Sequence, residues 1–167
     1  MRTRILTLIV ALLPGVLAGC ASGARTAAAS PADDHAFHAL QERGEHAMGV
    51  DQYTSTHRFD ALPDGGRIEL QRDADDPAGV ARIRGHRKEI VGAFSRGDFG
   101  TPAFVHMREV PGTAVMAAMK DAITYTFREL PRGGEVRITT TDPEAVRAIH
   151  DFMAFQRSDH RAGGRAH

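Results

Sequence analysis

Polar and apolar residues alternate along two stretches of the chain, as they do in β-strands that bury one face. In the first stretch Phe59 and Ala61 alternate with the polar residues Arg58 and Asp60, and Ile68 and Leu70 repeat the pattern after a short interruption. The interruption, Pro-Asp-Gly-Gly at 63–66, suits a tight turn because proline fixes φ and glycine accepts positive φ. This stretch therefore predicts a β-hairpin.

The same pattern returns near the other end of the chain. Tyr125 and Phe127 alternate with polar residues before a second Leu-Pro-x-Gly-Gly sequence, and Val136 and Ile138 alternate after it. Each copy is followed by Asp-Pro, which marks a helix start because Asp caps the helix and Pro fits its first position. The chain therefore predicts an internal ββα pseudo-repeat, with units at about 55–97 and 122–160.

Apolar residues recur at helical spacing after each Asp-Pro. Residues 77–96 carry Ile83, Ile90 and Phe94 on one side, and residues 143–159 carry a similar stripe. Shorter helices are predicted at 34–48 and 112–121, whereas 101–107, with a proline near the start, is expected to form an edge strand or ordered loop. These elements predict an α+β fold: a two-layer sandwich with two long helices on one face of a four-stranded antiparallel sheet.

The first residues are typical of a bacterial secretion signal. Arg2 and Arg4 precede an apolar run from 5 to 13 that is too short to span a bilayer. The segment ends in Leu-Ala-Gly-Cys at 17–20, which resembles the lipobox of bacterial lipoproteins. The resemblance implies that residues 1–19 are removed and that Cys20 carries lipid. Because Ala21 rather than Asp follows, it also implies anchoring at the periplasmic face of the outer membrane.

The lipid anchor would be joined to a single folded domain. Residues 20–34 are small or polar and lack apolar periodicity, so a flexible tether is expected there, before a domain at 35–160. The final residues, 161–167, are expected to be disordered. Cys20 is the single cysteine, so its lipidation would leave no disulfide and no thiolate metal site.

Charge and motifs argue against several classes of function. Lys and Arg together number 21, and so do Asp and Glu, so no positive field attracts nucleic acid. The sequence has no Gly-x-Ser-x-Gly elbow, no phosphate-binding glycine loop and no His-Glu-x-x-His zinc motif. The chain is therefore expected neither to bind nucleic acid nor to be an enzyme.

Histidine and methionine remain as candidates for chemistry. All nine His and five of the six Met follow Cys20. Imidazole and thioether groups suit copper, and imidazole also suits zinc. The alternative is that these side chains fill the core and its rim, which is the commoner role of Met at helical spacing and of half-buried His. The candidate metal or ligand cluster consists of His46, Met48, His57, His86 and His106.

Several short sequences between 44 and 160 also carry a resemblance. They are Met-Gly-Val-Asp-Gln at 48–52, Thr-His at 56–57, Ile-Arg-Gly-His at 83–86, Gly-Asp-Phe at 97–99 and Ala-Ile-His-Asp-Phe at 148–152. Together they resemble a family of small secreted bacterial proteins without established function, members of which have carried an aspartate carbamoyltransferase label. This chain does not support that activity, because it lacks a Ser-Thr-Arg-Thr-type phosphate loop and is too short for that two-domain enzyme.

Two functions are consistent with this pattern. The leading hypothesis is a lipid-anchored, non-catalytic periplasmic binding module for a small ligand or a soft metal such as copper. Its site would lie in the first repeat unit, where His57 and His86 stand in place of Tyr125 and Phe152. The alternative is a structural or interaction protein of the cell envelope, without a ligand, whose polar sheet face contacts a protein partner. That face would carry Thr56, Arg58, Thr124, Thr126, Arg137 and Thr139.

Overall fold

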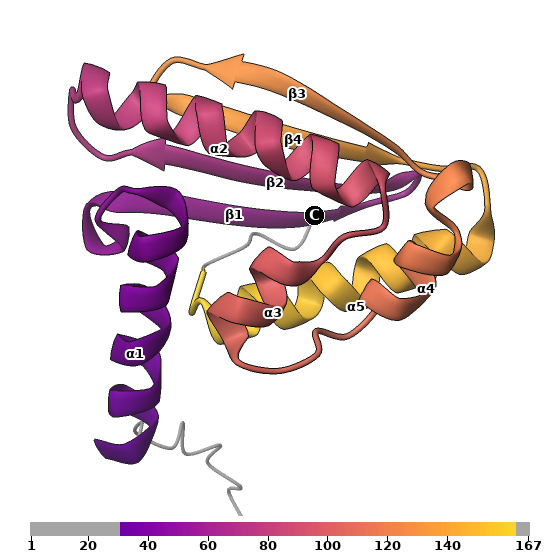
Figure 1. Cartoon of the computed structure of the whole chain (residues 1–167), viewed down its shortest axis with the longest axis horizontal. Coiled ribbons are helices and arrows are strands. Elements are labelled where there is room, and N and C mark those ends of the chain that lie inside the picture. Colours follow the sequence, from indigo (N-terminus) through magenta and orange to yellow (C-terminus); the bar gives the residue numbers. More distant parts are fainter. Residues whose placement is uncertain (1–30, 163–167) are drawn as a thin grey trace, which may run out of the picture.

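An antiparallel sheet of four strands forms the centre of the fold (Figure 1). The structure is a computed structural model and describes residues 31–162. The strands are β1 (Ser55–Leu62), β2 (Gly65–Arg72), β3 (Thr124–Leu130) and β4 (Gly133–Thr139), and they lie in the order β1-β2-β4-β3. The predicted α+β class with a four-stranded antiparallel sheet is confirmed.

Glycines begin both inner strands, directly after two-residue hairpin loops. A Cβ atom at Gly65 would lie 2.2 Å from the carbonyl oxygen of Ile138, and one at Gly133 would lie 2.0 Å from that of Leu70. Because β2 and β4 are neighbours in the sheet, these glycines let the two hairpins approach each other. Gly65 has the predicted positive φ, 140°, but both glycines are strand residues, and the loops are Pro-Asp and Pro-Arg.

Five α-helices accompany the sheet in the described residues: α1 (Pro31–Met48), α2 (Pro77–Ser95), α3 (Gly100–His106), α4 (Thr113–Ala118) and α5 (Pro143–Asp159). Two short 3-10 helices span Gln52–Thr54 and Lys120–Ala122. Helices α2 and α5 begin where predicted, because the carboxylates of Asp76 and Asp142 accept hydrogen bonds from free backbone N–H groups of the first turn.

Two segments differ from the prediction. Residues 100–106 form helix α3 rather than an edge strand or loop, because Pro102 lies in the first turn, where its missing N–H leaves no helical bond unmade. Helix α1 begins at Pro31, so residues 31–34, which were assigned to the tether, are helical. The predictions for the signal segment, for Cys20 and for residues 163–167 lie outside the described residues.

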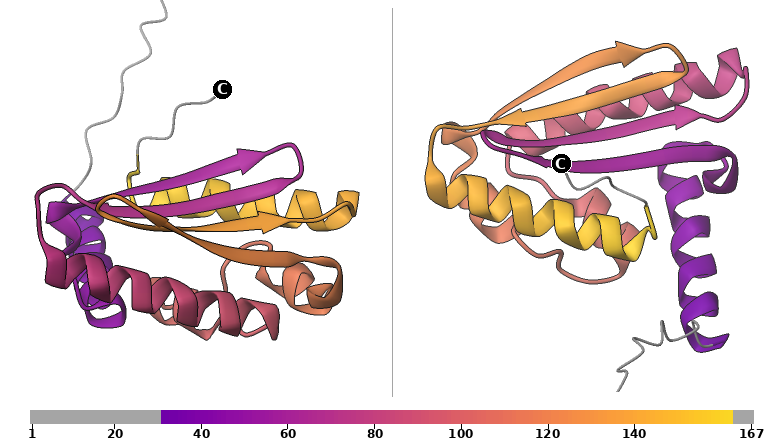
Figure 2. Two further views of the ribbon diagram at one scale, coloured as in Figure 1. Left: turned by 90° about the horizontal axis from the view of Figure 1, so that it is seen from above. Right: turned by 180° about the vertical axis from the view of Figure 1, so that it is seen from behind.

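Each of the helices α2 and α5 packs mainly on the hairpin that is remote from it in the sequence. Helix α2 follows β2 in the chain but contacts chiefly β4 and β3, whereas α5 follows β4 and contacts β1 and β2. Figure 2 shows α2 beside the β3–β4 hairpin and α5 beside β1. Helix α4 packs on α5, and α3 packs on α1. The helix of each ββα segment therefore covers the hairpin of the other segment.

The main core lies between these helices and the sheet. Strand residues Ile68, Val136 and Ile138 and helix residues Ile149 and Phe152 are almost completely buried there. Burial of such side chains is the main favourable contribution to folding, at roughly 1.5–3 kcal/mol for each. A smaller cluster near the end of α1 consists of Met48, Val50, Leu70 and Ile83.

Ion pairs occupy sheet positions that alternate with the core residues. Arg128 donates from Nε and Nη2 to the two carboxylate oxygens of Glu135, each at 3.0 Å. Arg67 donates from the same two nitrogens to the carboxylate of Asp60. Glu135 is only 4% exposed, so a bidentate partner matches a carboxylate that has little access to water.

Candidate functional site

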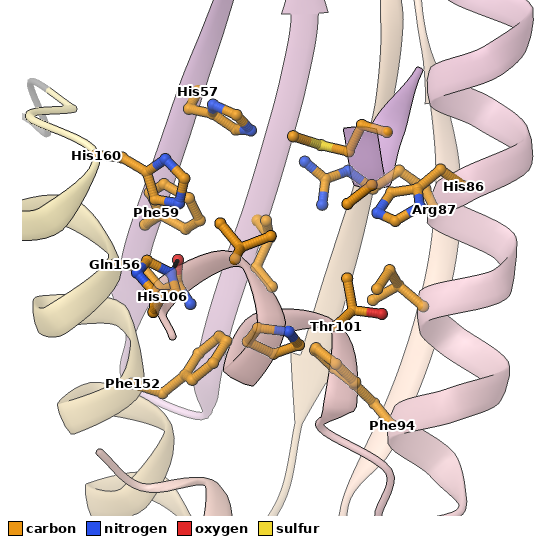
Figure 3. A pocket seen from close by; sticks show the side chains of 16 residues that line it. His57, Phe59, His86, Arg87, Phe94, Thr101, His106, Phe152, Gln156 and His160 are labelled. Carbon is orange, nitrogen blue, oxygen red and sulfur yellow. Dashed lines mark hydrogen bonds between the residues drawn. The ribbon is translucent and has the colours of Figure 1, made fainter. Parts of the chain in front are cut away.

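A small pocket lies where the end of α1, strand β1 and helices α2, α3 and α5 meet (Figure 3). Its cavity volume is about 60 Å³. Because one water needs about 10–15 Å³ of such space, the cavity has room for a few waters or one small molecule. Aromatic and aliphatic side chains form much of the wall. The polar lining residues are His57, His86, Arg87, Thr101, His106, Gln156 and His160.

Four of the five predicted site residues line this pocket, although they are far apart in the sequence. Met48 comes from the end of α1, His57 from β1, His86 from α2 and His106 from α3. The fifth, His46, is exposed and lines an adjoining groove instead. The fold thus brings together residues that the sequence analysis grouped by their chemistry alone.

Two of these residues already have partners in the fold. Met48 is 8% exposed and packs in the smaller apolar cluster. In His106, Nδ1 donates to Oδ2 of Asp159 over 2.5 Å, and Nε2 lies 3.0 Å from Oε1 of Gln156. Both ring nitrogens of His106 are therefore engaged, and any ligand bound there would have to displace one of these hydrogen bonds.

Stacked rings form one wall of the pocket. The His57 ring stacks on Phe59, with the centroids 5.5 Å apart. His160, at the end of α5, lies 5.4 Å from Phe59 and 5.0 Å from His57 between ring centroids. Nδ1 of His160 is buried and has no hydrogen-bond partner among residues 31–162.

Arg87 enters the pocket from α2, across the cavity from this wall (Figure 3). The residue is 5% exposed. Its Nε and Nη2 atoms are buried without a hydrogen-bond partner among the described residues. Buried arginine is normally paired, so a guanidinium without a partner is an unusual feature of this site.

Burial favours the neutral form of His57, His86 and His160, while Arg87 stays charged. Desolvation, aided by the positive charge of Arg87, lowers the pKa of His86 to about 4 and, together with His106, that of His160 to about 3. The pKa of His57 is also well below its usual value, chiefly through burial and then because a charged His57 would be repelled by His160 and Arg87. Desolvation lowers the pKa of Arg87 only to about 10. At neutral pH the charged Arg87 therefore lies among the neutral imidazoles of His57, His86 and His160.

A wider groove adjoins the pocket on the side of α1, α2 and α3. Its volume is about 560 Å³, and it shares Ala47, His86, Ile90 and Thr101 with the pocket lining. His46 lies in this groove, with its ring centroid 5.8 Å from that of Phe104. Phe104 is 44% exposed, so an apolar ring faces solvent beside the pocket.

Three pocket residues were not predicted from the sequence: Arg87, Gln156 and His160. A signal for Arg87 was present, because position 87 belongs to the helical stripe that contains Ile83 and Ile90, and a charged residue in such a stripe is unusual. Gln156 is buried on α5, and its place in the apolar stripe of that helix predicts a core position rather than a site. His160 follows the last helical residue, and nothing in the local pattern indicates that the chain there returns to β1.

The described residues contain no group of three or more His, Cys, Asp or Glu side chains placed to hold a metal ion. None of the described helices is both long and apolar enough to cross a membrane. Comparison with protein-family models, with curated proteins and with solved structures gives no match to this chain. The family resemblance drawn from short sequences stays a prediction.

Proposed function

We propose that the chain is a lipid-anchored, non-catalytic binding protein of the bacterial envelope, and that its site is the pocket between α1, β1, α2, α3 and α5. The observation that supports this proposal is the convergence of His57, His86 and His106 from three separate elements on one cavity. Ligand sites commonly combine apolar walls with a few convergent polar groups, as this pocket does.

A non-catalytic role fits the chemistry of the lining. None of the described residues that line the pocket is a Ser, Cys or Lys that the pocket histidines could activate as a nucleophile. Asp159 contacts the site only through His106. The polar groups are thus suited to holding a ligand in place.

We also propose the finer architecture expected from the sequence, a two-layer sandwich built from an internal ββα pseudo-repeat. Two observations support it: the strand order β1-β2-β4-β3 places the two hairpins side by side, and both Asp76 and Asp142 cap helices at equivalent positions. A Cβ at Gly66 would lie 2.6 Å from Met153 and 2.9 Å from Ile149, both on α5, and this close contact between helix and sheet supports the proposed layering.

Binding of small molecules is the direct test. Ligand-observed NMR on the purified full-length chain, with a panel of small carboxylates, amides, alcohols and amines, should detect saturable binding. Filling the cavity with Val105→Phe should abolish it, whereas Val80→Phe, outside the pocket, should not. If no member of the panel binds, or if Val105→Phe binds as well as the wild type, the proposed site is wrong.

A soft metal is the second candidate, because neutral imidazole is the form that ligates metals. Cu(I), Cu(II) and Zn(II) titrations of the full chain should then show binding that weakens in both His57→Ala and His86→Ala. The charge of Arg87 in the same pocket opposes any bound cation. Affinity no tighter than micromolar, or binding that survives both substitutions, would eliminate this candidate.

The envelope location has its own test. In a bacterial host the wild-type chain should incorporate a palmitate analogue, and Cys20→Ser should not. As a matched variant, Ala21→Asp should keep the label but move the protein from the outer to the inner membrane in a density gradient. Equal labelling of wild type and Cys20→Ser would show that Cys20 is not the acylated residue.

A further inference from the structure

The two unpartnered nitrogens of Arg87 lie on one edge of its guanidinium group. Nε–H and the outward N–H of Nη2 point in the same direction, and together they match the two oxygens of a carboxylate. Neither nitrogen has a hydrogen-bond partner among residues 31–162, and the residue is 5% exposed. Arg87, which lines the pocket, therefore has an unused bidentate donor pair.

The same donor pair is already used elsewhere in this fold. Arg128 binds both oxygens of Glu135 through Nε and Nη2, each at 3.0 Å. Arg67 binds Asp60 through the same two nitrogens. In both cases the partner is a carboxylate with little exposure to solvent, since Glu135 is 4% exposed and Asp60 is 9% exposed. Elsewhere in this protein, therefore, the group that binds the Nε–Nη2 edge of an arginine is a carboxylate.

No other group of the pocket neutralises Arg87. The three histidines whose pKa the charge of Arg87 lowers, His57, His86 and His160, are neutral at pH 7, chiefly because they are buried. No described carboxylate lines the cavity. Burying a charge without a partner destabilises the folded protein. An anion that binds beside Arg87 would offset this cost by pairing with the guanidinium group.

We propose that the pocket binds the carboxylate group of a small organic acid, held by Nε and Nη2 of Arg87. This inference rests on the proposed ligand-binding function and adds the class of ligand. One fixed cation matches one negative charge, which favours a monoanion over a dianion such as phosphate. A cavity of about 60 Å³ suits a carboxylate with few carbon atoms, and the groove at Ala47, Ile90 and Thr101 leaves space for a longer apolar body.

Matched acids and amides provide the test. NMR shift titrations of the full chain with acetate and propionate, at ionic strength held constant with sodium chloride, should give saturable shifts at the Arg87 Nε–H signal. Acetamide and propionamide have the same shape without the charge, and we expect them to bind at least about tenfold more weakly. Arg87→Lys keeps a charge but loses the paired donors, and it should also weaken acetate binding at least about tenfold.

The outcomes separate the inference from the proposed function. Arg128→Lys is the control, and it should leave acetate binding unchanged. If the amides bind as well as the acids, or if Arg87→Lys retains the affinity for acetate, the carboxylate assignment is wrong while the pocket remains a ligand site. If neither the acids nor the amides bind, the carboxylate assignment is wrong, and the proposed ligand site is overturned as well only if the small alcohols and amines also fail to bind. The comparison of acids with amides needs only the wild-type chain, so it holds even if a variant fails to fold.

Discussion

At the scale of single residues, glycine decides how closely the two hairpins can approach. The Cβ of an alanine at position 133 would lie 2.0 Å from a backbone oxygen, which cannot move without breaking the β2–β4 pairing. At Gly85, on the exposed side of α2, an added Cβ would have no neighbouring atom within 4 Å. Replacement of glycine by alanine should therefore lower the stability of the fold at position 133 and raise it at position 85.

We predict that Gly133→Ala lowers the free energy of unfolding by about 1–3 kcal/mol or more through overpacking. Gly85→Ala should raise it by about 1 kcal/mol, because alanine is the better helix former. Urea unfolding followed by circular dichroism measures both. A tolerated alanine at position 133 would contradict the close approach of β2 and β4.

The unpartnered charge of Arg87 also affects stability. In the pseudo-repeat alignment that pairs Ile83 with Ile149, the counterpart of Arg87 is Met153, which is fully buried. Arg87→Met should therefore raise the free energy of unfolding, by about 1–4 kcal/mol, because it replaces a buried unpaired charge with an apolar side chain. Arg128→Met should lower it, because Glu135 would lose its partner. Thermal unfolding without added carboxylate tests this contrast, and a lower midpoint for Arg87→Met would refute it.

At the scale of elements, the two hairpins and the helices α2 and α5 could be predicted because several local signals agreed. Alternation, Leu-Pro-x-Gly-Gly turns and Asp-Pro starts all indicated the same boundaries. Helix α3 was missed because a proline is compatible both with an edge strand and with a first helical turn, and only packing against α1 decides between them. Arg87 was not predicted to be buried because arginine is usually exposed, although its position falls in the apolar stripe of the helix. The convergence of the pocket depends on contacts between distant segments, which periodicity does not encode.

The cap of α5 gives a prediction at this scale. The Asp142 carboxylate accepts hydrogen bonds from the backbone N–H groups of Glu144 and Ala145 at 2.8 and 3.1 Å. Asp142→Ala should lower the free energy of unfolding by about 1 kcal/mol, whereas Asp142→Asn should retain most of the stability, since asparagine caps nearly as well. Chemical denaturation distinguishes the two, and equal losses would indicate that the cap contributes little.

At the scale of the whole molecule, the buried histidines should make stability depend on pH. The folded-state pKa values of His57, His86 and His160 lie below 6.5, so below that pH the unfolded chain binds more protons than the folded one. The free energy of unfolding should therefore be highest above pH 6.5 and fall as the pH drops toward 4. Each histidine contributes at most about 1.4 kcal/mol per pH unit.

Asp64 and Asp76 lose their stabilising contribution below this pH window. The pKa values of Asp64 and Asp76 are lowered from 3.8 by their hydrogen bonds, so their stabilising contribution is lost only at still lower pH. Urea unfolding at pH 7.5, 6, 5 and 4.5 should show a steady loss of stability, and His160→Phe should reduce the slope. A flat profile between pH 6.5 and 4.5 would show that these imidazoles are not buried in the neutral form.

Helix α2 packs on the β3–β4 hairpin and α5 packs on the β1–β2 hairpin, and this arrangement limits the order in which the protein can fold. A ribosome completes β1, β2 and α2 before it adds the strands that α2 covers, and the β1–β2 hairpin lacks its own helix until α5 is made. The first half of the chain therefore cannot bury its apolar surfaces by itself. We propose that this chain is exported through a membrane. The delay in folding would help keep the nascent chain unfolded, and therefore able to pass through a translocation channel, until nearly all of it has been synthesised.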